Sequence, residues 1–214
     1  EINKRLPTGS KILDNMLDGG YEKDIITTIY GPAGSGKTVL CLLCSINIAR
    51  NGKKVVYVDS EGGFSLERLK QIAVHINQDY KKILEHMIFL RPTSFAEQKK
   101  SFEKLKDIVN DKIGLIIVDT IAMLYRLELS KNEDIREVNL ELGKQIAYLT
   151  EIARKKDIPV LITNQVYADF DDRDKVNIVG GDILKYGSKC LIELQITPNG
   201  NRRWILKKHR SLEA

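Results

Sequence analysis

The chain has 214 residues, of which 43% are hydrophobic and 29% charged, and its formal net charge is +5. This length suits one domain with a continuous core, and this composition excludes a disordered or fibrous chain. No apolar run approaches the roughly 20 residues that a membrane span requires, and the first residues show no signal-peptide pattern, so we expect a cytoplasmic protein.

Short β-branched runs alternate along the chain with longer amphipathic ones. The β-branched runs predict strands at 25–30, 54–59, 87–90, 114–119 and 159–163. The apolar periodicity of the segments between them predicts helices at Thr38–Asn51, Ser65–Asn77, Phe95–Val109 and Asp134–Lys156. This order is typical of an α/β fold with a mainly parallel twisted sheet and helices on both of its faces.

The segment GPAGSGKT, residues 31–38, follows the first predicted strand and opens the first predicted helix, as a phosphate-binding loop requires. Its glycines allow consecutive backbone N–H groups to surround phosphate oxygens at a helix N-terminus. Lys37 should reach the β- and γ-phosphates, and the Thr38 hydroxyl should bind Mg²⁺. We therefore expect ATP and Mg²⁺ as ligands, with nucleotide contacts from Gly31, Pro32, Ala33, Gly34, Ser35, Gly36, Lys37, Thr38 and Val39.

Two of the three cysteines, Cys41 and Cys44, form a C-x-x-C inside the first predicted helix, on one helical face. A zinc site would need two further ligands, and Cys190 and the histidines are scattered along the chain. We expect both thiols to be packed in the core.

Three polar side chains follow predicted strands, at the edge where open α/β sheets hold their ligands. Glu61, in YVDSEGGF, is the candidate base that orients and deprotonates water. Asp119 ends LIIVD and is the candidate Mg²⁺ carboxylate, with a helix cap or a turn residue as its alternative. Gln165 follows the strand at 159–163, where an amide can sense the γ-phosphate by hydrogen bonding.

The last two β-branched runs, at 189–197 and 202–209, lie on either side of Asn199-Gly200. This dipeptide is the usual signal for a tight hairpin with a primed turn. The parallel sheet is therefore expected to end in a C-terminal antiparallel hairpin.

Several segments occur in the order found in RecA-like recombinases: LPTGSKILDNMLDGGYEKDIITTIYGPAGSGKT, VVYVDSEGGFSLERL, LIIVDTIAMLYRLEL and LITNQV. The chain resembles that family over almost its whole length, and within it the archaeal recombinase paralogues. The resemblance implies one RecA-like P-loop ATPase core at residues 1–214, without the N-terminal helical DNA-binding domain of full recombinases. It also implies weak, DNA-dependent ATP hydrolysis in DNA repair and recombination.

The same resemblance assigns roles to individual residues. It supports Glu61 as the catalytic carboxylate, Asp119 at the Mg²⁺ site and Gln165 as the γ-phosphate sensor, and it adds Arg68 as a stacking partner for adenine. The segment after Asp119 corresponds to the family's first DNA loop, and the C-terminal strand is basic. We therefore expect DNA phosphates to be contacted by Arg126, Lys131, Arg136, Arg202 and Arg203.

The final KKHR resembles a Lys-x-Arg pair of hexameric relatives. Lys208 and Arg210 are therefore candidates for reaching the nucleotide of a neighbouring subunit, and a solvated or DNA-facing patch is the alternative. The implied partners are single- and possibly double-stranded DNA, a main recombinase, other repair proteins and further copies of the chain.

A run of aspartates follows Gln165 in ADFDDRDKV. An EF-hand is excluded, because Arg173 stands at the next ligand position and Gly180 where the final glutamate belongs. We expect a loop beside the γ-phosphate sensor whose negative charge weakens DNA contact, formed by Asp169, Asp171, Asp172 and Asp174.

Two other functions stay open at this point. A KaiC-like regulatory ATPase would act through protein contacts alone, and DNA binding separates it from a recombinase paralogue. A mediator would bind ATP and a partner recombinase with negligible turnover, and the hydrolysis rate separates it from an ATPase.

Overall fold

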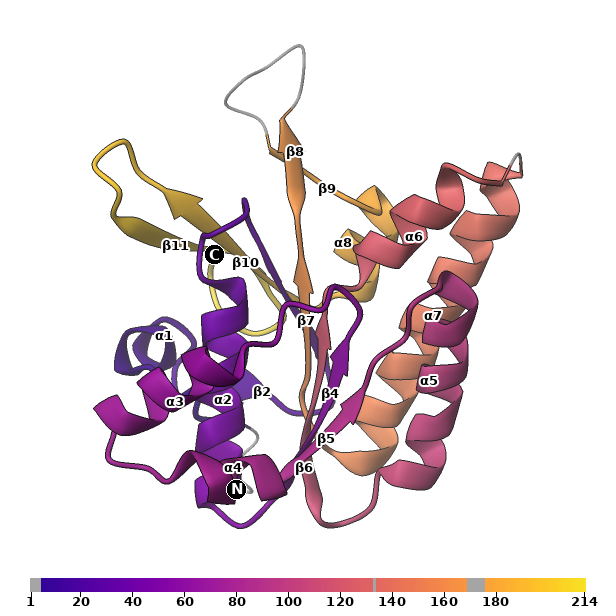
Figure 1. The fold of residues 1–214 in the computed structure, drawn as a ribbon. Coiled ribbons are helices and arrows are strands. Elements are labelled where there is room, and N and C mark those ends of the chain that lie inside the picture. The colour runs from indigo at the N-terminus through magenta and orange to yellow at the C-terminus, as the bar shows by residue number, and fades with distance from the viewer. Residues whose placement is uncertain (1–4, 133, 169–175) are drawn as a thin grey trace.

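The computed structural model describes residues 5–132, 134–168 and 176–214. These residues fold around a seven-stranded sheet of order β11-β10-β3-β7-β6-β4-β5 (Figure 1). Neighbouring strands pair in parallel, except that β11 runs antiparallel to β10. The strands are β3 (Ile26–Tyr30), β4 (Lys54–Asp59), β5 (Met87–Leu90), β6 (Ile113–Asp119), β7 (Val160–Asn164), β10 (Cys190–Ile196) and β11 (Arg202–His209). The predicted α/β fold is confirmed.

Helices cover both faces of this sheet, as the alternation of strands and helices predicts (Figure 1). One face carries α1 (Lys11–Met16), α2 (Lys37–Arg50), α3 (Leu66–His75) and α4 (Tyr80–Glu85). The other carries α5 (Phe95–Ile108), α6 (Ala122–Leu129), α7 (Ile135–Lys156) and α8 (Gly181–Gly187). Short antiparallel pairs join β1 (Arg5–Leu6) to β2 (Tyr21–Glu22) and β8 (Val166–Ala168) to β9 (Val176–Ile178).

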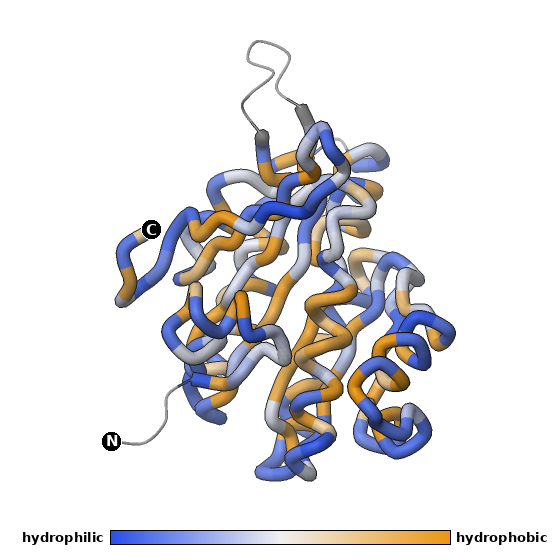
Figure 2. The backbone as a smooth tube through the Cα atoms, turned by 90° about the vertical axis from the view of Figure 1, so that its left-hand side faces the viewer, coloured by the Kyte–Doolittle hydropathy of each residue, from blue (hydrophilic) through white to orange (hydrophobic). Residues whose placement is uncertain are grey.

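Two apolar cores lie on the two faces of the sheet. Strand β4 supplies both, because successive side chains of a strand point to opposite faces: Val55 and Tyr57 enter one core, Val56 and Val58 the other. Figure 2 shows apolar residues concentrated along the central strands and the adjoining helices. Within the described residues, no helix is both long and apolar enough to cross a membrane.

Polar side chains fix where several helices begin. The Ser65 and Ser94 hydroxyls accept hydrogen bonds from Arg68 N (3.2 Å) and Glu97 N (3.1 Å) at the starts of α3 and α5. Asp134 caps α7 in the same way. Each cap satisfies an N–H group that has no partner inside the helix.

Cys41 and Cys44 lie in the core, as predicted, and both are 0% exposed. Burial is the main cause that raises the pKa of each thiol far above its ordinary value. Both side chains therefore pack as small apolar groups.

The hairpin between β10 and β11 is confirmed, but the predicted primed turn at Asn199-Gly200 is wrong. Gly200 N donates to Thr197 O at 2.8 Å, so Pro198 and Asn199 are the central residues. Gly200 follows them with φ +77°. Because proline holds φ near −65°, Pro198 cannot adopt the positive φ that a primed turn needs at its first central position.

The segment expected to form the first DNA loop is largely helical. Residues 122–129, AMLYRLEL, form α6, and α7 begins at Ile135. Leucine, methionine, alanine, arginine and glutamate are good helix formers, which explains the difference.

Candidate active site

The loop between β3 and α2 forms an open cradle at a helix N-terminus. Gly34 (φ +74°) and Gly36 (φ +104°) adopt the left-handed backbone that favours glycine, and a Cβ atom at either would meet nothing within 4 Å. At Gly31 a Cβ atom would lie 2.5 Å from Leu194 O, so only glycine fits beside β10. The buried Ser35 hydroxyl has no hydrogen-bond partner within the described residues. These features fit a bound phosphate chain.

Lys37 lies inside this cradle, with 7% of its surface exposed. Its Nζ donates to Gly31 O and Pro32 O, at 2.8 Å each. Burial lowers the pKa of Lys37, and the Asp119 and Glu61 carboxylates oppose that shift. The side chain is thus held where its charge faces the loop.

Asp119, at the end of β6, is 3% exposed and faces α2. Its Oδ2 accepts from Thr38 Oγ1 (2.9 Å) and from Tyr57 OH (2.7 Å), and its Oδ1 accepts from Thr163 Oγ1 (2.5 Å). No side chain caps α6, so the alternative role of Asp119 as a helix cap is excluded. A carboxylate beside a hydroxyl supplies the oxygen ligands that Mg²⁺ prefers.

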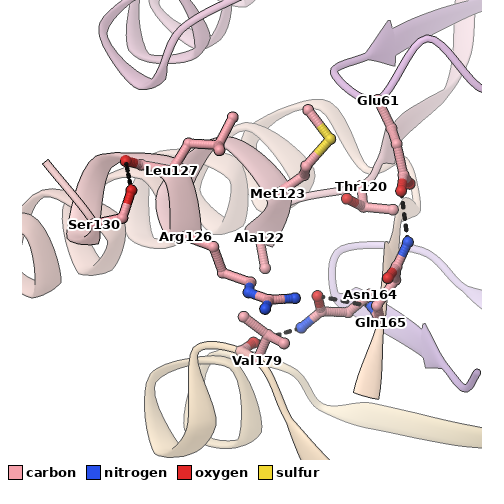
Figure 3. A pocket seen from close by; sticks show the side chains of 10 residues that line it. All are labelled: Glu61, Thr120, Ala122, Met123, Arg126, Leu127, Ser130, Asn164, Gln165 and Val179. Carbon is pink, nitrogen blue, oxygen red and sulfur yellow. Dashed lines mark hydrogen bonds between the residues drawn. The ribbon is translucent and has the colours of Figure 1, made fainter. Parts of the chain in front are cut away.

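Glu61 and Gln165 meet, although β4 and β7, the strands before them, are separated in the sheet by β6. Gln165 Nε2 donates to Glu61 Oε1 at 2.5 Å (Figure 3). Partial burial raises the pKa of Glu61, Asp119 adds to this shift, and Lys37 opposes it. The candidate base and the candidate sensor therefore form one hydrogen-bonded pair.

Two cavities share this pair. The first, about 680 Å³, is lined by residues 33–38 of the P-loop together with Glu61, Asp119 and Gln165. Arg68, the predicted adenine contact, also lines it. The second cavity, about 320 Å³, lies toward α6. A volume of several hundred Å³ suits a small-molecule ligand such as a nucleotide.

Arg202 and Trp204 line the first cavity as well, a position that sequence reasoning missed. Arg202 was expected to contact DNA. Both side chains point to the same face of β11, because they are two residues apart.

The other predicted contacts lie outside the first cavity. Arg126 lines the second cavity, while Lys131, Arg136 and Arg203 are exposed. Asp169, Asp171, Asp172 and Asp174 lie outside the described residues.

The two trans-acting candidates have partners in their own chain. Lys208 Nζ donates to Lys185 O (2.8 Å) and Ser188 O (2.9 Å). Arg210 pairs with Glu22 (3.1 Å) and Asp24 (2.9 Å). Reaching a neighbouring subunit would require both side chains to leave these partners, and that role stays a prediction.

The family model described as Rad51 matches residues 3–211. The chain belongs to the Rad51 family. It is 44% identical over 218 residues to the DNA repair and recombination protein RadB of Methanobrevibacter smithii, covering 99% of this chain and 90% of the relative. It is also 44% identical over 203 residues to the RadB protein of Methanocaldococcus jannaschii, covering 92% and 90%.

Among solved structures, this Rad51-family chain is similar to the crystal structure of the RadB recombinase. The TM-score is 0.83 and the identity 38%, over 96% of this chain and 90% of that one. The resemblance to RecA-like recombinases and their archaeal paralogues is confirmed, as is the RecA-like fold.

Proposed function

We propose that this chain is an accessory protein of homologous recombination and DNA repair that binds ATP with Mg²⁺, binds DNA and hydrolyses ATP weakly. The 2.9 Å contact between Thr38 and Asp119 is the observation that supports the proposal best, because a hydroxyl and a carboxylate that could bind Mg²⁺ lie together beside the phosphate cradle. The relatives are named as DNA repair and recombination proteins, which supports this biological setting.

Different residues of the first cavity would take different parts in phosphoryl transfer. The P-loop N–H groups and Lys37 would hold the phosphates, and Thr38 and Asp119 would hold the metal. Bound Mg²⁺ would neutralise charge that develops on the phosphate oxygens. Glu61 would orient the attacking water and accept its proton, and the Gln165 amide would fix the Glu61 carboxylate through their 2.5 Å hydrogen bond.

Trp204 offers a direct test of nucleotide binding, because it is the chain's single tryptophan and lines the first cavity. Titration with Mg²⁺ and ATP should change its fluorescence along a saturable curve. Lys37→Ala should remove the response, because the ammonium is the cation placed in the cradle.

The matched control is Lys104→Ala, an exposed lysine of α5 on the other face of the sheet, which should bind as the unchanged chain does. Tight ATP binding by the Lys37→Ala variant would contradict the assignment of this cavity.

A further inference from the structure

The second cavity, about 320 Å³, lies between α6 and the ends of β7 and β9 (Figure 3). Ala122, Met123 and Leu127 of α6 and Val179 beyond β9 supply the apolar part of its wall, and the other lining residues are polar or charged. Leu127 is 47% exposed, so its side chain is accessible to a ligand from solution. The cavity therefore suits an apolar group that enters from outside.

Most polar groups of this cavity already have partners. Asn164 Nδ2 donates to Val179 O (2.6 Å), and Asn164 Oδ1 accepts from Gln165 N (3.0 Å). Glu61 is bound by the Gln165 amide. Arg126 differs: within the described residues its guanidinium has neither an ion pair nor a side-chain hydrogen bond, and it points into the cavity (Figure 3). An entering ligand would thus meet one free positive charge.

We propose that this cavity receives an apolar side chain of a partner protein, and that a carboxylate next to it on the partner pairs with Arg126. Buried apolar anchors beside an arginine are typical of the energetic centre of protein interfaces. Methionine adapts its shape to such an anchor.

A DNA base fits the cavity less well. Among the described residues no aromatic ring lines it, so a base would find no stacking surface there. The Asn164 amide already binds Val179 O and Gln165 N, so only one N–H and one oxygen lone pair remain for the edge of a base.

The position of the second cavity would allow its occupant to affect the proposed nucleotide site. Glu61 and Gln165 line both cavities, so their hydrogen-bonded pair is a shared wall. A partner in the second cavity would touch this pair from one side while ATP approached it from the other. This regulatory consequence rests on the proposed function, whereas the docking site does not.

The three methionines permit a selective test, because each gives one signal when its methyl group carries ¹³C. Met123 lines the cavity, whereas Met16 and Met87 pack in the core on the opposite face of the sheet. Acetyl-Asp-Phe-amide should shift the Met123 signal along a saturable curve and leave the other two signals in place. Acetyl-Asn-Phe-amide, which lacks the charge, and acetyl-Asp-Ala-amide, which lacks the anchor, should bind more weakly.

Arg126→Gln tests the charge without disturbing the core, since the side chain is exposed. It should weaken binding of the acidic dipeptide about fivefold, to the level of its neutral analogue. The control Arg136→Gln, at an exposed arginine of α7 outside the cavity, should change nothing.

Equal affinity for the acidic and neutral dipeptides, or undiminished binding by Arg126→Gln, would overturn the proposal. An oligothymidylate that shifts the Met123 signal when the dipeptides do not would assign the cavity to DNA instead. All of these measurements omit ATP. If the chain did not bind nucleotide, the result for the second cavity would therefore be unaffected.

Discussion

Two opposing effects act on the pKa of the Glu61 carboxylate. Partial burial and Asp119 favour its protonated form, while Lys37 favours its ionised form, and the net effect raises its pKa. A carboxylate with a raised pKa is a better proton acceptor than an ordinary glutamate, because a general base works best with a pKa closer to the working pH. The environment of Glu61 therefore suits the role that its place after β4 predicts.

This shift predicts the pH dependence of ATP hydrolysis. Protonated Glu61 cannot take a proton from water, so the rate should fall as pH falls, with a midpoint above the ordinary value for glutamate. Glu61→Gln should lower the single-turnover rate of ATP hydrolysis by at least about 100-fold. The remaining rate should no longer fall as pH falls.

Glu67→Gln, at an exposed glutamate of α3, is the control. It should keep both the rate of ATP hydrolysis and its fall at low pH. An unchanged rate in Glu61→Gln would show that Glu61 performs no chemistry, and would favour a mediator that binds ATP without turning it over.

Sequence reasoning identified the candidate site residues whose position in the chain suggests a role. Asp119 ends a strand and Glu61 and Gln165 follow one, and parallel strands bring their carboxyl ends to one edge. Tyr57 and Thr163 escaped notice because they sit inside apolar strand runs, where periodicity assigns side chains to the core. Their contacts with Asp119 depend on the pairing of β4, β6 and β7, which no local pattern reveals.

Helix α8 packs against α7 at a glycine. A Cβ atom on Gly187 would lie 2.4 Å from Ile146 Cγ2, a methyl group fixed close to the α7 backbone. Gly187→Ala should therefore lower the free energy of unfolding by about 1–3 kcal/mol, measured by urea denaturation. In an Ile146→Ala background the same change should cost much less, because the obstructing methyl group is gone.

Gly143 of α7 is the matched control, since a Cβ atom there would meet nothing within 4 Å. Gly143→Ala should raise stability by up to about 1 kcal/mol, because alanine is the better helix former. Equal losses at both glycines would show that α8 does not pack on α7 as described.

The long helices could be predicted from sequence and the short ones could not. Helix α7, with 22 residues, repeats its apolar period often enough to be recognised. Helices α6 and α8, with 8 and 7 residues, show too few periods, and tertiary packing supports them. The prediction for the turn before β11 is wrong because Pro198 precedes Asn199-Gly200, and the fixed φ of proline decides the turn type.

The two faces of the sheet separate two proposed activities. On β11, Trp204 pairs across from Leu194 and Arg203 from Gln195, so their side chains point to opposite faces. Arg202 lies with Trp204 on the face of the first cavity, while Arg203 lies on the other face with Lys207, which pairs with Glu193 at 3.7 Å. We therefore expect these two neighbouring arginines of one strand to serve different ligands.

Arg202→Gln and Arg203→Gln form a matched pair that tests this separation, since both side chains are exposed and carry the same charge. Arg202→Gln should weaken ATP binding, followed by Trp204 fluorescence, and leave DNA affinity nearly unchanged. Arg203→Gln should keep ATP affinity but weaken single-stranded DNA binding, and lower the slope of log affinity against log salt by about 0.7 for one lost phosphate contact.

Equal effects of the two substitutions on both ligands would show that the faces do not divide the activities. If the unchanged chain bound neither single- nor double-stranded DNA at low salt, its net charge of +5 could not be attributed to a nucleic-acid partner. A KaiC-like regulatory ATPase, acting through protein contacts alone, would then be the better account of this fold.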